Sequence, residues 1–376
     1  MKICDKCGRQ NPDDTVFCMG CGHMIGLRPE RRPSPVPQAP VYPRPEDTSG
    51  KTTVDTIVDG LNDFIGNDAP VKLKWTDLFV SVLKKHTQAE AEDLFIYGTR
   101  RTTPPLYAVS SEWPKPWLYS RVLLVFVITY IMLSLCVQIG NLLAVPGLIA
   151  VGSMAFPLTT IILFYELNAY RNISIYYSAM FFLLGGGASL LLTLVLYRFI
   201  PDFMLGEMDY IAATAVSLVE ETGKLMIVYF LLKRLPERNY ILNGLLVGAA
   251  VGAGFSAFES AGYAFRFLLS EDISSMYEVI HVRAFFSPGS HIAWAAVSGA
   301  ALVIAKGNSP ITMSVFSSGK FWRLACFPLL FHMLWDCPLL DEIWWVKCAL
   351  LTVAVWVILM ILISMGLNEV SKVSLR

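Results

Sequence analysis

Apolar stretches separated by short polar turns fill the chain from about residue 118 to about residue 366. Each stretch reaches the roughly 17–25 residues that a helix needs to cross a bilayer. The pattern predicts about eight spanning helices, at residues 118–140, 145–165, 174–198, 209–232, 241–266, 286–305, 322–340 and 343–366. We therefore expect an all-α polytopic membrane protein whose transmembrane domain covers residues 116–368.

The composition agrees with this pattern and limits the partners. Of the 376 residues, 55% are hydrophobic, which is above the share in ordinary soluble domains. The formal net charge is zero, so the chain lacks the basic excess by which proteins bind nucleic acid. We expect no signal peptide, because Met1 and Lys2 lead directly into a cysteine cluster.

Four cysteines near the N-terminus form two Cys-x2-Cys pairs, namely Cys4, Cys7, Cys18 and Cys21. Paired knuckles of this kind let four thiolates close around one Zn²⁺, and the metal supplies folding energy that so short a segment lacks. Disulfides are the alternative, which a reducing compartment disfavours. Residues 1–26 resemble the short zinc ribbon that begins many prokaryotic membrane proteins. The resemblance implies a structural zinc.

Two further segments precede the apolar region. Residues 27–50 hold seven prolines between Pro29 and Pro45, which favours an extended linker. Residues 51–115 are expected to form a cytosolic amphipathic helical region, in which Thr87 and Glu90 match a capping box. A zinc module at the end of a tether leads to the hypothesis that it binds a cytosolic protein partner.

Basic residues predict the orientation in the membrane. One set of loops carries Arg171, Lys233, Arg234, Arg238, Lys306, Lys320, Arg323, Lys372 and Arg376. The opposite loops carry only Arg198, Arg266, Arg283 and Lys347, together with eight acidic residues. Because basic loops stay in the cytoplasm, we expect a multi-pass protein of the cell membrane with both termini cytoplasmic.

Six ionisable side chains lie inside the predicted spans, namely Glu220, Glu221, Glu259, His291, His332 and Asp336. A charge in hydrocarbon costs at least about 2.5 kcal/mol, so such residues are candidates for function. One buried His or Glu can also simply hydrogen-bond neighbouring helices. The four residues Glu220, Glu259, His291 and His332 lie roughly 8–15 Å from the outer ends of their helices. This matched depth favours one shared site.

Spacing places these groups on inward-facing sides of their helices. Glu220 and Lys224 are four residues apart and can pair. Glu259 continues a stripe of Gly244, Gly248 and Gly252, and small residues at this spacing let helices approach closely in lipid. His332 and Asp336 share a face in the same way, so Asp336 can orient the imidazole or face the site itself.

At these residues the chain resembles the PrsW family of intramembrane proteases, which is related to the type II CAAX prenyl proteases. The matching stretches are Glu220-Glu221-x2-Lys224, Phe258-Glu259-x3-Tyr263, His291-x7-Gly299 and His332-x3-Asp336, in the family's order. The resemblance covers roughly residues 145–340. It implies a helical bundle with a glutamate-rich proteolytic site, and a transmembrane protein as substrate.

Peptide hydrolysis needs an activated water, a proton shuttle and stabilisation of the oxyanion. Low dielectric favours a carboxylic acid that can exchange a proton, so Glu220 or Glu221 is the expected general base. Two roles are open to His291 and His332. They bind a catalytic divalent metal with a carboxylate such as Glu259, or they hydrogen-bond the water and oxyanion directly.

Two non-proteolytic interpretations compete with this one. Buried carboxylates and histidines also build proton or ion pathways in transporters. A scaffold that binds membrane partners through the zinc module is the other alternative. A conduction path needs polar residues toward both faces, whereas those of this chain gather in the outer half. We therefore expect a membrane-embedded peptidase.

Overall fold

The computed structural model describes residues 2–4, 6–12, 52–67, 69–99, 101–105, 108–109, 112–235 and 240–374. The chain divides into two compact units, Met1–Gly50 and Lys51–Arg376. In the first unit, strands β1 (Lys2–Ile3) and β2 (Gln10–Asn11) pair antiparallel, with Lys2 opposite Asn11. Cys4 is buried and Cys7 exposed in the turn between them, whereas Cys18 and Cys21 lie outside the described residues.

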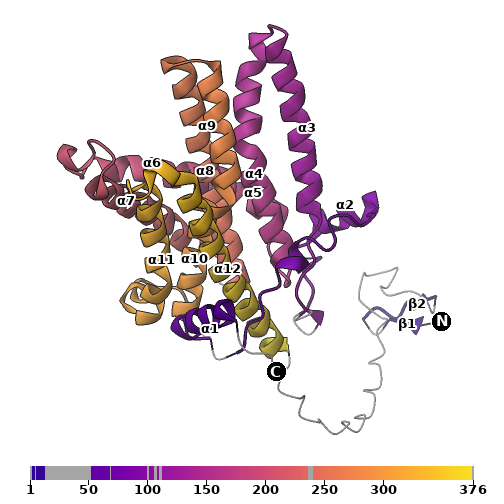
Figure 1. The fold of residues 1–376 in the computed structure, drawn as a ribbon. Coiled ribbons are helices and arrows are strands. Elements are labelled where there is room, and N and C mark those ends of the chain that lie inside the picture. Colours follow the sequence, from indigo (N-terminus) through magenta and orange to yellow (C-terminus); the bar gives the residue numbers. More distant parts are fainter. Residues whose placement is uncertain are drawn as a thin grey trace. The chain divides into compact units, whose positions relative to one another are not determined.

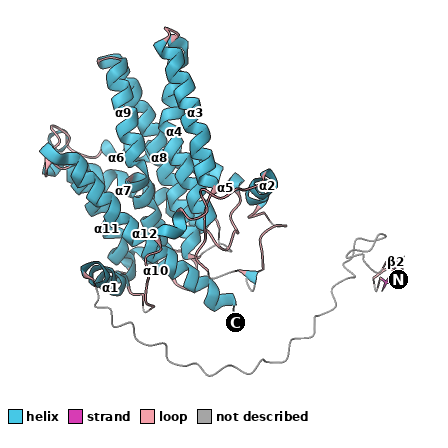
Figure 2. Cartoon of the chain, turned by 45° about the vertical axis from the view of Figure 1, so that its right-hand side comes forward, coloured by secondary structure: helices cyan, strands magenta, loops and turns pink. Residues whose placement is uncertain are grey.

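The second unit is helical throughout its described part (Figures 1 and 2). Its α-helices are α1 (Thr53–Ile65), α2 (Gln88–Ile96), α3 (Leu118–Gln138), α4 (Val145–Leu167), α5 (Ile175–Met180), α6 (Gly186–Tyr197), α7 (Tyr210–Lys233), α8 (Ile241–Ser270), α9 (Ile273–Phe286), α10 (His291–Lys306), α11 (Gly319–Asp336) and α12 (Trp344–Ser374). A single π-helical stretch, Phe181–Gly185, joins α5 to α6. Short 3₁₀ turns are Trp75–Leu78, Leu142–Ala144, Asp202–Met204, Ser287–Gly289, Met313–Ser317 and Asp341–Ile343.

The helices confirm an all-α polytopic membrane fold. Within the described residues, six segments are long and apolar enough to cross a membrane, namely Leu118–Gln138, Leu142–Leu167, Ile175–Tyr197, Ile241–Ser270, Ile273–Lys306 and Asp341–Lys372. The predicted spans at 209–232 and 322–340 form α7 and α11 but are not among the six. Each carries at least three charged residues, several of which belong to the site described below.

One predicted loop is wrong. The sequence between residues 266 and 286 was expected to be an outer loop, but α8 continues to Ser270 and α9 follows at once as a helix. Asp272 caps α9 by accepting the Ser275 backbone N–H at 2.8 Å. Arg266 and Arg283 therefore lie on helices. In Figure 1 the α8–α9 and α3–α4 hairpins extend beyond the level at which α11 ends and α12 begins.

Glycines on α8 set the distance to α10. A Cβ atom at Gly244 would lie 2.5 Å from the Gly299 carbonyl oxygen, and one at Gly248 or Gly252 would collide with the backbone of α10. The two helices therefore touch through their backbones, which brings dispersion contacts that a lipid environment does not otherwise supply. Because α10 begins at His291, this contact fixes the imidazole against α8.

Helices α1 and α2 precede the bundle and contact it or lead into it. The predicted capping box at α2 is confirmed, because Glu90 N–H donates to Thr87 Oγ1 at 3.2 Å and Thr87 N–H donates to Glu90 Oε2 at 2.7 Å. α1 lies across the base of the bundle and packs on α11, where Phe64 meets Phe327 edge to face. Glu166 of α4 accepts the first backbone N–H groups of α3 at 2.8–2.9 Å.

Candidate active site

Four helices bring the ionisable residues predicted from the sequence into one polar cluster. α7 supplies Glu220, Glu221 and Lys224, α8 supplies Glu259, α10 supplies His291, and α11 supplies His332 and Asp336. These seven residues are linked by hydrogen bonds and ion pairs throughout. The name polar cluster is used below for this set.

Glu221 and Lys224 form the buried base of the cluster. Lys224 has no exposed surface, and its Nζ lies 2.6 Å from Glu221 Oε1. His332 Nδ1 lies 2.9 Å from the same oxygen. A buried ammonium is strongly destabilising unless a carboxylate compensates it, so Glu221 is held as the counter-ion of Lys224. Its carboxylate also fixes one nitrogen of His332.

The two imidazoles are oriented by groups on either side of each ring. Lys224 Nζ lies 2.8 Å from His291 Nδ1. Since an ammonium can only donate, Nδ1 accepts, and the opposite nitrogen carries the proton that faces Glu259 Oε2 at 3.1 Å. His332 Nε2 lies 3.2 Å from Asp336 Oδ2. The indole of Trp294 stacks on the His332 ring, with the centroids 4.6 Å apart.

Glu220 has one oxygen with a hydrogen-bond partner and one without. The Tyr197 hydroxyl donates to Oε1 at 3.0 Å. Oε2 is buried and has no hydrogen-bond partner among the described residues. It lies 3.8 Å from His332 Nε2 and 4.0 Å from His291 Nδ1. A buried carboxylate oxygen without a donor costs about 1–3 kcal/mol or more, so this position is suited to a ligand such as water or a metal ion.

The donor set at this position fits a divalent transition metal. Ligand atoms of Glu220, His291 and His332 all lie within 4.8 Å of one another. Two imidazoles and one carboxylate are a common catalytic zinc set that leaves a position for water. The carboxylate in this group is Glu220, whereas the sequence pointed to Glu259. Glu259 instead lies on the outer side of the His291 ring, where carboxylates typically orient a metal-binding histidine.

Arg283, Tyr197 and Trp294 contact the cluster, and the sequence does not predict these contacts. Arg283 pairs with Glu259, and its Nε donates to Ser260 Oγ at 2.9 Å. It was assigned to a loop because α9 was not recognised. Tyr197, at the end of α6, resembled an ordinary interfacial aromatic. Nothing in the local sequence of Tyr197 indicated a contact with Glu220, which is 23 residues away.

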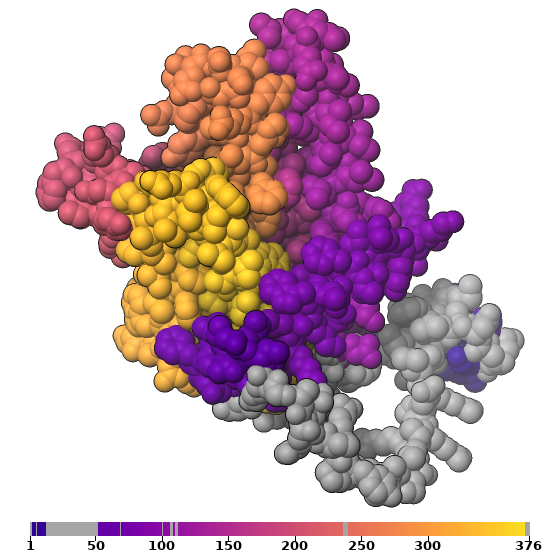
Figure 3. Space-filling view, viewed as in Figure 1, coloured from indigo at the N-terminus to yellow at the C-terminus, as the bar shows by residue number. Residues whose placement is uncertain are grey.

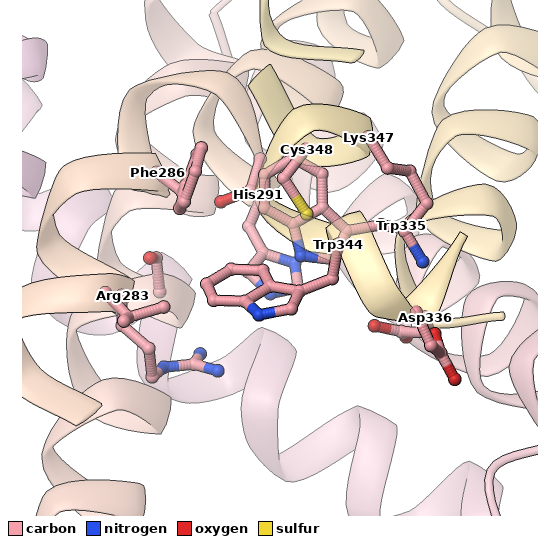
Figure 4. Close-up of a pocket in the computed structure, with 12 residues that line it drawn as sticks. Arg283, Phe286, His291, Trp335, Asp336, Trp344, Lys347 and Cys348 are labelled. Atoms are coloured by element: carbon pink, nitrogen blue, oxygen red, sulfur yellow. The ribbon is translucent and has the colours of Figure 1, made fainter. Parts of the chain in front are cut away.

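Two hollows reach the cluster, and they share no lining residue. The first, called the polar cavity, has a volume of about 320 Å³ and is shown in Figure 4. It is lined by Ser256, Val282, Arg283, Phe286, Ser290, His291, Trp335, Asp336, Asp341, Trp344, Lys347 and Cys348. In Figure 4, Arg283 and Asp336 lie on opposite sides of Trp344.

The second hollow, called the lateral cleft, has a volume of about 390 Å³ and lies among α6, α7 and α8. It is lined by Leu190, Thr193, Leu194, Tyr197, Glu220, Phe255, Phe258, Glu259, Gly262, Tyr263 and Arg266. His291 and Asp336 therefore face the polar cavity, and Glu220 and Glu259 face the lateral cleft. A third hollow of about 380 Å³ lies beside both, because it shares Arg283 and Trp344 with the polar cavity and Tyr263 with the lateral cleft.

Comparison with known proteins identifies two regions. Residues 174–365, about half of the chain, match the model of the PrsW family of intramembrane metalloproteases. This segment contains the whole polar cluster, together with Tyr197 and Arg283. Residues 3–25 match the zinc-ribbon domain. No curated protein and no solved structure shows significant similarity to the chain.

Proposed function

Because the chain belongs to the PrsW family of intramembrane metalloproteases, we propose that its polar cluster hydrolyses a peptide bond of a membrane-anchored protein. The observation that carries the proposal is Glu220 Oε2, a buried carboxylate oxygen without a hydrogen-bond partner that faces two imidazoles. A water at this point would meet a proton acceptor and two nitrogen ligands at once. Glu221 Oε2 is also buried without a hydrogen-bond partner among the described residues, but it is Glu220 Oε2 that lies within 4.0 Å of a nitrogen of each imidazole.

Each residue has a role in this scheme. Glu220 holds the reacting water and accepts its proton, while Tyr197 keeps the carboxylate turned toward the imidazoles. If no metal is bound, His332, held between Glu221 and Asp336, would deliver a proton to the leaving amine. Lys224 compensates the negative charge of the glutamates.

The side chains of Glu220, His291 and His332 would hold the divalent metal that the family description implies. When bound, the metal supplies Lewis-acid polarisation of the water and the scissile carbonyl. Glu259 and Glu221 would then orient the two imidazoles from outside.

Transport is less well supported than hydrolysis. From Gly244 to Phe255 the sequence of α8 is entirely apolar, and its residues are buried. The facing part of α10 is likewise built of Ala, Val, Leu and Ile, apart from Trp294, Ser298 and Gly299. An ion path past Lys224 would have to cross this dry packing. With both termini cytoplasmic, as the charge distribution predicts, the site would lie toward the outer face.

Cleavage is tested by comparing membrane proteomes of cells that carry wild type, Glu220→Gln or His291→Ala. A membrane-protein fragment present with wild type should disappear in both variants. Glu207→Gln, the same substitution at an exposed loop position, should leave the fragment in place. If every fragment survives in both site variants, hydrolysis by this cluster is wrong.

Metal content is measured separately on the purified full chain. We expect two metal ions per chain, one lost in His332→Ala and the other lost in Cys4→Ser/Cys7→Ser. If the His332→Ala variant keeps both ions, the polar cluster does not bind the second metal. The cleavage test would still stand.

A further inference from the structure

The lateral cleft is wedge-shaped because α6 and α8 touch at one end and diverge at the other. At the closed end, a Cβ on Gly186 would lie 2.5 Å from Gly254 Cα. Two turns later on α8, a Cβ on Gly262 would meet nothing within 4 Å. The helices thus open from backbone contact to free space over about eight residues.

The open end of the cleft faces outward from the bundle. Gly262 is exposed, and the large apolar residues Leu191 and Leu194 of α6 are 64% and 57% exposed. In Figure 3 the segment that joins α6 and α7 projects away from the α8–α9 hairpin, and the surface between them is hollowed. Both residues belong to the apolar segment Ile175–Tyr197, which is long enough to cross a membrane, so their exposed side chains would contact acyl chains. The cleft therefore connects Glu220 with the lipid phase.

The polar cavity on the other side of the cluster has a different lining. It carries Asp341, Lys347 and Arg283 beside His291 and Asp336. Its border is an exposed turn before α12 that carries Asp341 and Glu342 among exposed apolar residues. Such a lining suits water. The lateral cleft also carries charge, from Glu220, Glu259 and Arg266, but two leucines and two phenylalanines line it as well. These apolar residues suit an apolar polypeptide.

We propose that the substrate's apolar membrane segment reaches Glu220 sideways, through the lateral cleft between α6 and α8, while water arrives through the polar cavity. This inference rests on the proposed function. A segment that presents a scissile bond is locally unwound, and unwound backbone in a membrane is tolerated only where protein groups satisfy it. The cleft wall carries the Glu220 and Glu259 carboxylates and the Tyr263 side chain.

The first experiment fills the cleft without disturbing packed atoms. Gly262→Leu would place a side chain in the open space between α6 and α8, whereas Gly262→Ala adds a single Cβ that meets nothing. Gly60→Leu is the matched control, since Gly60 is also an exposed helical glycine with free space around its Cβ. The readout is the membrane-protein fragment that Glu220→Gln abolishes.

We expect Gly262→Leu to reduce that fragment at least tenfold at unchanged protein level and melting temperature. Gly262→Ala and Gly60→Leu should retain it. A full fragment yield in Gly262→Leu, together with loss in Glu220→Gln, would overturn the lateral route and leave the proposed protease function intact.

The second experiment does not depend on cleavage. A nitroxide is attached to p-acetylphenylalanine introduced at Leu194 or at Asp341 of the full chain in liposomes, which leaves the native cysteines untouched. Collision rates are then measured with molecular oxygen, which concentrates in lipid, and with a water-soluble nickel chelate. The label at 194 should favour oxygen and the label at 341 should favour nickel. Nickel-dominated relaxation at 194 would show a water-filled cleft and contradict the proposal, whether or not the chain is a protease.

Discussion

Two parts of the same helix, α8, behave in opposite ways. At Gly244, Gly248 and Gly252 the helix is sealed against the α10 backbone, and any Cβ would collide. At Gly262, facing α6, the same residue type borders open space. The sealed part fixes His291 at a set distance from Glu259, whereas the open part leaves Glu220 accessible. Glycine thus allows close packing on α10 in one half of α8 and leaves open space beside the helix in the other half.

The strongest way to break this comparison is to place one substitution at both kinds of glycine. Gly248→Leu should destabilise the protein by at least about 3 kcal/mol, the upper end for overpacking, because backbone rather than a flexible side chain opposes it. Gly262→Leu should change the stability little. The measurement is the unfolding midpoint in detergent at matched lipid content. Equal losses at the two sites would contradict the distinction.

A second test removes the buried charge at the base of the cluster. Lys224→Met leaves Glu221 without its counter-ion, and breaking a buried pair costs about 3–5 kcal/mol. Adding Glu221→Gln removes the orphaned charge and should restore most of the stability, though not the activity. The measurement is a double-mutant cycle of unfolding free energies. Additive losses would show that Lys224 and Glu221 do not depend on each other.

A third, smaller effect concerns the border of the open part. Arg283 pairs with Glu259 where the two side chains are 25% and 16% exposed, so Arg283→Gln should cost only about 1 kcal/mol of stability. Its effect on cleavage should be larger, since Glu259 orients His291. Arg283→Lys should restore only part of the activity. Its ammonium can pair with Glu259, but it lacks the planar fork by which the guanidinium also reaches Ser260. Cleavage at wild-type rate in Arg283→Gln would exclude this positioning role.

The smallest effect lies outside the bundle, in the capping box of α2. Thr87→Ala should lower the stability of α2 by about 1 kcal/mol, because the N-cap hydrogen bond is lost. The hydrogen bond from the Thr87 backbone N–H lowers the pKa of Glu90. A depressed folded pKa means that this support is present at neutral pH and is lost as the pH falls through that value. Hydrogen exchange of α2, corrected for intrinsic rates, should therefore accelerate on acidification while α8 stays protected.

Most of the helices and the members of the polar cluster were predictable from local patterns. Apolar length located the spans, and charge inside apolar sequence singled out Glu220, His291 and His332. The stripe of glycines ending at Glu259 predicted close helix packing, which the α8–α10 contact confirms. These signals depend on residues three to seven apart, which a sequence displays directly.

Apart from α9, the features that escaped prediction depend on residues far apart in the chain. The sequence predicts a loop at α9 because Glu271, Asp272, Glu278 and Arg283 gather in a region expected to face water, although most residues of α9 are apolar. The contact of Tyr197 with Glu220 joins α6 to α7. The choice between Glu220 and Glu259 beside the imidazoles depends on side-chain directions across three helices. No pattern along one helix encodes these directions.

The most direct test of the account uses the purified full chain in liposomes with the membrane protein identified by the proteomic comparison, in water enriched in ¹⁸O. Mass spectrometry of the fragment should show one ¹⁸O in the new carboxyl group with wild type, and no fragment with Glu220→Gln. Undiminished, ¹⁸O-labelled product from Glu220→Gln would place the hydrolysis elsewhere and contradict the central claim.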